Sequence, residues 1–207
     1  VAAALATTAK PAVRQTSSTT FEPPAAKNSA QHWAIVAAQL PGAPVNDLAQ
    51  AVAMTGFPLD WYHFALAVPG APVAVLSQKV ALQSTRLSQS TAAARETARV
   101  AYFFARYIPG AQVGALETAV VRSRDPQTLF DFAMNIPTAD KEVLAEQMLG
   151  TGDSAWACKF ATKVKSSFTS DLVDLVLKDE NPALAVEVLS AGLSAAQTAE
   201  VLRIVVT

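Results

Sequence analysis

The large apolar residues of this chain recur in a pattern that repeats along most of its length. In five segments, one apolar residue is followed eight positions later by a leucine, at Leu40 and Leu48, Val68 and Leu76, Ile108 and Leu116, Ile136 and Leu144, and Val164 and Leu172. Successive segments are 28, 40, 28 and 28 residues apart, so one unit carries 12 extra residues. A fixed period of this length predicts a fold built from stacked repeats.

Each unit contains two stretches with helical apolar spacing. In the first stretch a large residue precedes an alanine, and we expect these large residues to be equivalent core positions: Val36, Phe64, Phe104, Phe132 and Phe160. Phe130 should be less buried than Phe132. The second stretch carries apolar residues at i, i+3 and i+7, as at Val45, Leu48 and Val52, which is typical of one helix face.

Helix-start signals place the unit boundaries at residues 29–56, 57–96, 97–124, 125–152, 153–180 and 181–207. Asp125, Asp153 and Asn181 each precede a proline or serine at the first helical position, where their side chains can cap the helix. Ser29 and Thr97 are expected to do the same in their units. The last unit is degenerate, because Leu193 stands where the turn proline is expected.

Two short helices joined by a tight Pro-Gly turn form a hairpin. The sequence therefore predicts an all-α fold over residues 29–207, a short right-handed α-solenoid of about six 28-residue helix-turn-helix repeats. At the level of architecture it resembles the HEAT and tetratricopeptide superfamilies. The period is shorter than in either superfamily and the tetratricopeptide Trp-Leu-Gly-Tyr signature is absent, so the resemblance transfers no site.

Two segments depart from the repeat. Residues 1–28 are rich in Ala, Thr, Ser and Pro and predict an extended tail that lies on another chain; its basic, acid-poor composition is typical of organellar presequences and of what remains after their cleavage. The polar 12-residue insertion lies within residues 81–96 and contains Arg86 and Arg95. It is either a contact element on one face of the stack or a solvated loop or helix extension.

Low charge characterises the whole chain. Apolar residues make up 51% and charged residues 16%, with a net charge of −1, whereas about 25% of residues are charged in an average soluble domain. Either part of the surface faces another protein or the composition reflects an alanine-rich bias. The charge balance argues against a primary nucleic-acid binder, which needs clustered Lys and Arg. Cys158 is the only cysteine, so no intrachain disulfide forms, and it is expected in the core.

No catalytic, cofactor or metal motif emerges from the remaining polar residues. His32 and His63 occupy non-equivalent repeat positions, and neither has a nucleophile and carboxylate at triad spacing. Asp125 and Asp153 are explained by capping. Glu142 and Glu146 are explained by a solvated helix face. We therefore expect a protein that is not an enzyme and that has no cofactor.

Partner contact is the remaining candidate function. The densest aromatic patch follows the insertion and one of its faces must point away from the core, so the candidate contacts include Tyr102, Phe103 and Tyr107. The polar candidates are Arg86 and Arg95. The terminal residues Ile204, Val205 and Val206 need a covering surface, because a free solenoid ends in a polar cap.

These observations favour a non-catalytic structural or accessory subunit that scaffolds a large multiprotein assembly. The first hypothesis is a mitochondrial ATP synthase or respiratory-chain complex, with the chain peripheral to the membrane. The alternatives are a virion structural protein and an organellar RNA-binding helical-repeat protein. The last would need a basic concave face, which the charge count does not supply.

Overall fold

The computed structural model describes residues 29–88 and 91–206, and the predicted tail of residues 1–28 lies outside them. Within the described residues all regular structure is helical, which confirms the all-α prediction. The helices are α1 (Ser29–Ala38), α2 (Val45–Ala53), α3 (Pro58–Ala67), α4 (Val73–Thr85), α5 (Ala92–Tyr107), α6 (Val113–Ser123), α7 (Pro126–Asn135), α8 (Lys141–Leu149), α9 (Ser154–Lys163), α10 (Thr169–Lys178), α11 (Pro182–Glu187), the 3₁₀-helix η1 (Val188–Ala191) and α12 (Ala195–Val206).

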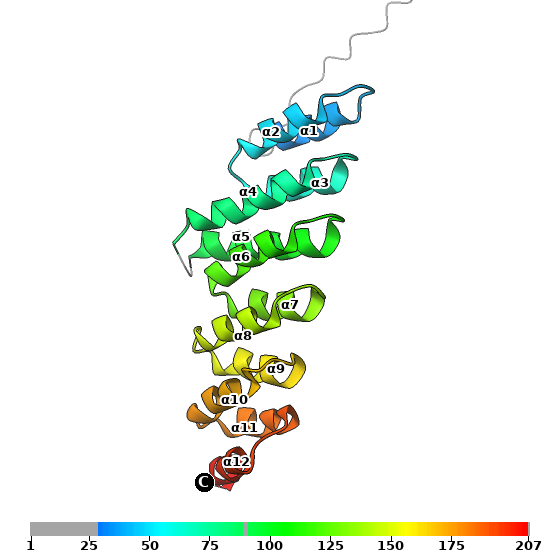
Figure 1. Cartoon of the computed structure of the whole chain (residues 1–207). Helices are drawn as coiled ribbons and strands as arrows, with labels where there is room; N and C mark the ends of the chain where they lie inside the picture. The colour runs from blue at the N-terminus through cyan, green and yellow to red at the C-terminus, as the bar shows by residue number, and fades with distance from the viewer. Residues whose placement is uncertain (1–28, 89–90, 207) are drawn as a thin grey trace, which may run out of the picture.

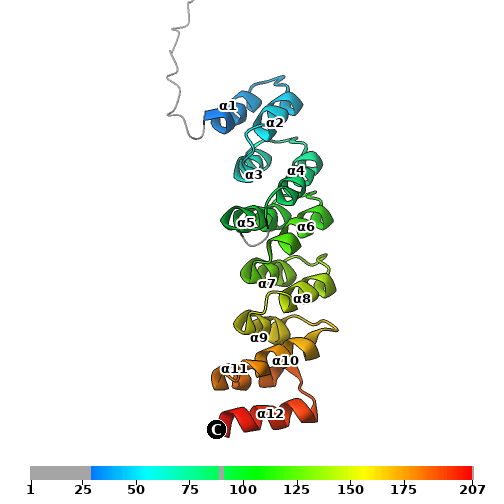
Figure 2. The ribbon, with the colours of Figure 1, turned by 90° about the vertical axis from the view of Figure 1, so that its left-hand side faces the viewer.

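The helices pair in chain order and the pairs follow one another along an elongated body (Figure 1). A view turned by 90° shows that the first and second helices of the pairs from α1 to α10 lie on opposite sides, while α12 runs across the end of the body (Figure 2). We call α1, α3, α5, α7, α9 and α11 the odd layer, and α2, α4, α6, α8, α10 and α12 the even layer. Each pair packs against the pairs before and after it, as in the contacts of α5 with α3 and α7.

Side-chain caps fix where several helices begin. Asp125, Asp153 and Asn181 accept hydrogen bonds from the backbone N–H groups of Thr128, Trp156 and Ala183 at 3.0–3.1 Å, as the sequence predicted. Asp140 caps α8 in the same way, through the backbone N–H groups of residues 142 and 143. Each cap satisfies helix N–H groups that have no partner within the helix.

The core is a line of phenylalanines between the layers. Phe64, Phe104, Phe132 and Phe160 are all 0% exposed, which confirms their equivalence, and Phe130 is half-buried as predicted. Val36, the equivalent in the first pair, is half-buried. The even layer contributes the predicted leucines, and Leu76, Leu116, Leu144 and Leu172 are buried. Burying each of these side chains is worth about 1.5–3 kcal/mol.

The insertion lengthens two helices, and the predicted boundary at Thr97 is wrong. α5 begins at Ala92 and is capped by Thr91, whose hydroxyl accepts a hydrogen bond from the backbone N–H of Ala94 at 3.1 Å. Thr97 is buried inside α5. Three alanines follow Thr91, and alanine has the strongest helix propensity, so the helix starts before the repeat register requires it.

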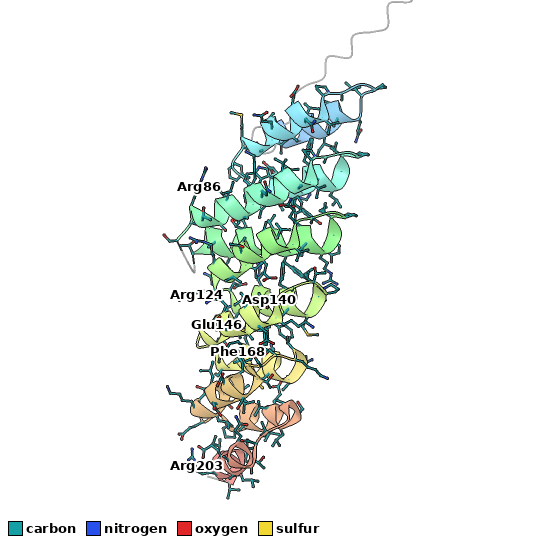
Figure 3. All side chains as sticks on the ribbon, viewed as in Figure 1. Arg86, Arg124, Asp140, Glu146, Phe168 and Arg203 are labelled. Atoms are coloured by element: carbon teal, nitrogen blue, oxygen red, sulfur yellow. The ribbon has the colours of Figure 1, made fainter. Side chains whose placement is uncertain are left out.

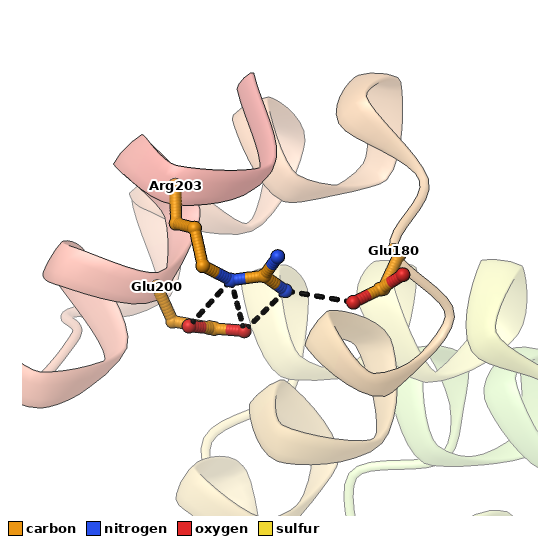
Figure 4. A network of polar contacts seen from close by, with 3 residues as sticks. All are labelled: Glu180, Glu200 and Arg203. Atoms are coloured by element: carbon orange, nitrogen blue, oxygen red, sulfur yellow. Dashed lines mark hydrogen bonds and ion pairs between the residues drawn. The ribbon is translucent and has the colours of Figure 1, made fainter. Parts of the chain in front are cut away.

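The last pair departs from the others, as its degenerate sequence suggests. α11 has only 6 residues and continues into η1 before α12 begins. The buried side-chain amide of Gln197 holds α12 to α10 by donating to the Ser170 carbonyl at 3.1 Å and the Asp174 carboxylate at 2.7 Å. Arg203 adds an exposed link to Glu180 and Glu200, each at 2.7 Å (Figure 4). Exposed ion pairs of this kind add little stability.

Candidate functional site

The histidine and cysteine side chains are the first candidates for catalytic or metal chemistry. His63 is exposed on α3, and the side chain of His32 lies outside the described part. Across residues 29–88 and 91–206, no three His, Cys, Asp or Glu residues are grouped so that they could hold a metal ion. Cys158 is 0% exposed, and burial raises the pKa of its thiol to about 11. A thiol with such a pKa is a poor nucleophile at neutral pH.

An aromatic cluster lies where α3 and α5 meet in the odd layer. The Phe103 ring lies 6.2 Å from the Tyr62 ring, 5.4 Å from the Tyr102 ring and 6.2 Å from the Tyr107 ring, measured between centroids. Phe103 is 39% exposed and Tyr107 is 50% exposed. Two of the three predicted aromatic contacts therefore face outward and lie side by side.

Tyr102 corrects the sequence prediction, because its side chain is only 7% exposed. Tyr102 occupies the same repeat position as Tyr62 and Phe130. Side chains at this position pack between neighbouring odd-layer helices. Tyr102 therefore contacts Arg106 of its own helix rather than a partner. The Arg106 guanidinium donates a hydrogen bond to the Tyr102 hydroxyl, and this bond raises the pKa of Arg106.

Arg106 is thereby held as a fixed cation beside the aromatic rings. Its guanidinium carbon lies 5.4 Å from the Tyr107 centroid and 5.7 Å from the Tyr102 centroid, within the range of cation–π attraction. Arg106 is exposed to solvent, and the Asp131 carboxyl on α7 is near enough to interact with it electrostatically. A guanidinium oriented in this way can bind a carboxylate or phosphate at low entropic cost.

A second aromatic–cation pair lies further along the odd layer. The rings of Phe130 on α7 and Trp156 on α9 are 5.7 Å apart, and Lys159 Nζ lies 4.0 Å from the Trp156 centroid. Asp131 on α7 lies near the cations of both aromatic–cation pairs. Burial raises the pKa of its carboxyl, whereas the nearby charges of Arg106, Arg99 and Lys159 lower it. We name the odd-layer face of α5, α7 and α9, with these rings and cations, the aromatic–cationic surface.

The other predicted contacts lie elsewhere. Arg86 projects at the edge of the stack, at the end of α4 (Figure 3), and Arg95 is exposed on α5. Ile204 is only 4% exposed, so the prediction that it needs a covering partner is wrong; it shares the inward face of α12 with Val201. Val205 and Val206 are 45% and 83% exposed. They lie at the α12 end of the body, far from the aromatic cluster (Figure 1).

The sequence reasoning missed Tyr62, Arg106, Trp156 and Lys159 as parts of one surface. The available signal was the repeat itself. Tyr62, Tyr102 and Phe130 occupy equivalent positions in successive units once the insertion is allowed for. An aromatic residue at the same position in three units predicts a row of rings along one layer.

Comparison of the chain with protein-family models, with curated proteins and with solved structures finds no match. The described helices include none that is both long and apolar enough to cross a lipid bilayer.

Proposed function

We propose that this chain is a right-handed α-solenoid of six helical-hairpin repeats that serves as a non-catalytic structural or accessory subunit of a larger protein assembly. The observation that carries the proposal is the aromatic–cationic surface. Exposed Phe103 and Tyr107 stand beside an oriented arginine, and aromatic residues and arginine are the side chains most enriched at the energetic centres of protein interfaces.

The assembly itself is proposed from composition. The acid-poor first 28 residues and the low overall charge favour a mitochondrial membrane complex, such as ATP synthase or a respiratory-chain complex, with a virion as the alternative setting. Cell fractionation followed by native gel electrophoresis tests this placement. Migration of the chain with a membrane complex of the mitochondrion supports it, and migration as a free chain outside that organelle contradicts it.

RNA binding is the second candidate, and the same surface favours it. Arg99, Arg106 and Lys159 are interspersed with exposed rings, and single-stranded RNA binds where bases stack on aromatic rings beside cations. Against it stands the net charge of −1, because phosphate neutralisation supplies most of such affinity.

Site-specific photo-crosslinking in the source cells distinguishes the two candidates. A photoreactive phenylalanine replaces Phe103 in one variant and Val143 in a control; both native side chains are 39% exposed, but Val143 lies on α8 in the even layer. A discrete protein adduct from position 103, absent from position 143, supports the subunit proposal. An adduct that ribonuclease removes supports RNA binding, and equal labelling from both positions contradicts both.

A further inference from the structure

The insertion creates a groove between α3, the end of α4 and the start of α5. When the repeats are aligned, α4 extends four residues further at its end than α2 does. In the same alignment, α5 begins six residues earlier than α3 does. Six residues of helix extend about 9 Å. The lengthened ends of α4 and α5 therefore project past the start of α3. Both α6 and α3 pack against α4 and α5. The groove lies where residues at the start of α3 face the lengthened ends of α4 and α5.

The groove has an apolar floor and an exposed apolar wall. It encloses about 580 Å³ and is lined by residues 56–60, Gln83, Leu87, Ala93, Glu96, Thr97 and Val100. Val100 and Thr97 are each 3% exposed, and the Thr97 hydroxyl donates to the Ala93 carbonyl at 2.9 Å, so the floor presents no unsatisfied polar group. Phe57 and Leu59 on the wall are 65% and 41% exposed.

Phe57 differs from its equivalents in the last three pairs, whereas Thr97, its equivalent in the third pair, lies inside α5 and does not cap it. The equivalent residues in three later pairs are Asp125, Asp153 and Asn181, and each caps its helix. Phe57 occupies the cap position of α3 without a side-chain hydrogen bond, and its ring faces solvent. The chain thus gives up a cap and exposes a large apolar side chain at the same place. A local rule broken without structural compensation is typical of a functional position.

The charged groups of the groove are both acidic. Asp60, in the first turn of α3, is half-buried and Glu96 on α5 is exposed, and neither forms an ion pair with any described residue. None of the described residues that line the groove is a Lys or Arg. Two unpaired carboxylates beside an apolar surface are complementary to a ligand that joins a large apolar group to a positive charge.

We propose that this groove binds a segment of a partner protein in which a large apolar side chain is flanked by Lys or Arg. The apolar side chain packs on Val100 between Phe57 and Leu59, and the basic side chain pairs with Asp60 and Glu96. The volume is enough for a few side chains of a peptide, and the exposed ring of Phe57 extends the apolar area beyond the hollow itself. This inference names a partner chemistry and rests on the proposed protein-binding function.

Selection from a displayed random peptide library against the whole chain tests the proposal. Enriched peptides should carry Lys or Arg next to Phe, Leu, Ile, Met or Trp. Their affinity, measured by fluorescence anisotropy, should fall by about fivefold or more in Asp60→Asn/Glu96→Gln. The control Asp47→Asn/Glu146→Gln makes the same change of charge at exposed residues outside the groove and should leave affinity unchanged.

A second variant separates binding from folding. Phe57→Asn restores the type of cap seen at Asn181, so its melting temperature should rise by about 2–4 °C while peptide affinity falls by about tenfold. A purely structural Phe57 would give no loss of binding.

Three results would overturn the proposal. The groove would not recognise a basic side chain if the enriched peptides were acidic or neutral. The same would follow if they bound Asp60→Asn/Glu96→Gln and the control double variant with equal affinity. Binding of benzyltrimethylammonium with no enriched peptide would assign the groove to a small organic cation. Self-association that Phe57→Asn abolishes, seen by light scattering, would assign it to a second copy of the chain. Photo-crosslinking from position 103 is independent of all three, so failure here leaves the proposed function standing.

Discussion

Replacement of Phe132 by alanine is the most direct test of how this molecule is held together. The Phe132 side chain is 0% exposed on α7, which packs against α5 on one side and α9 on the other. Phe132→Ala removes a fully buried ring and leaves a cavity in the core. Such substitutions reduce the free energy of unfolding by about 3–5 kcal/mol.

Phe130→Ala is the matched control, because it makes the same chemical change two residues away. Phe130 is half-buried, with ring centroids 5.7 Å from Trp156 and 6.4 Å from Phe160. Only part of its surface and two ring contacts are lost, so we expect a cost of about 1–2 kcal/mol. Urea denaturation followed by far-ultraviolet circular dichroism measures both free energies.

The order of the two costs decides the outcome. If Phe130→Ala costs as much as Phe132→Ala or more, the helical phase of α7 differs from the one described and the phenylalanine line is not the core. A typical domain has about 5–15 kcal/mol of stability in total, so Phe132→Ala can leave too little folded protein to measure. Phe132→Leu is then measured in its place. Its cost in free energy of unfolding should be greater than zero and smaller than the cost expected for Phe132→Ala.

Three further predictions concern the caps, the thiol and the terminal ion pairs. Asp153→Ala should lower the free energy of unfolding by about 1 kcal/mol, because the backbone N–H of Trp156 loses its acceptor, whereas Glu146→Ala on an exposed face should change it little; equal effects would contradict the cap. Cys158 should react with a thiol reagent at neutral pH only as fast as the chain unfolds, and rapid labelling of native protein would contradict its burial. Arg203 holds the pKa of Glu200 below its usual range, so Arg203→Gln should raise that pKa in an NMR titration; the stability from this pair is present at neutral pH and is lost as pH falls through the lowered pKa.

The features that the sequence predicted well are those encoded within one unit. Asp125 and Asp153 cap their helices because a capping side chain needs only the first turn of its own helix. Phe132 and its equivalents Phe64, Phe104 and Phe160 are buried because their spacing places them on the apolar faces of α7, α3, α5 and α9. Neither inference depends on how the units are placed relative to one another.

The wrong predictions concern contacts between units. Tyr102 lies two positions before Phe104, on a different side of α5, and a lone helix would expose it. In the stack α5 lies between α3 and α7, so two of its flanks are covered and Tyr102 is 7% exposed. The groove was equally hidden, because it arises from the unequal lengths of α3 and α5 and becomes visible only when the helices are placed side by side.

The order of contacts along the body has a mechanical consequence. Among the described residues, the substantial contacts join helices that are at most three elements apart in the chain, and none of these contacts joins one end of the described body to the other. A rotation of a few degrees at each interface between pairs displaces the far end by the sum of all of them, while each buried phenylalanine keeps its neighbours. A body with such contacts is expected to be stiff over one pair of helices and compliant over its full length.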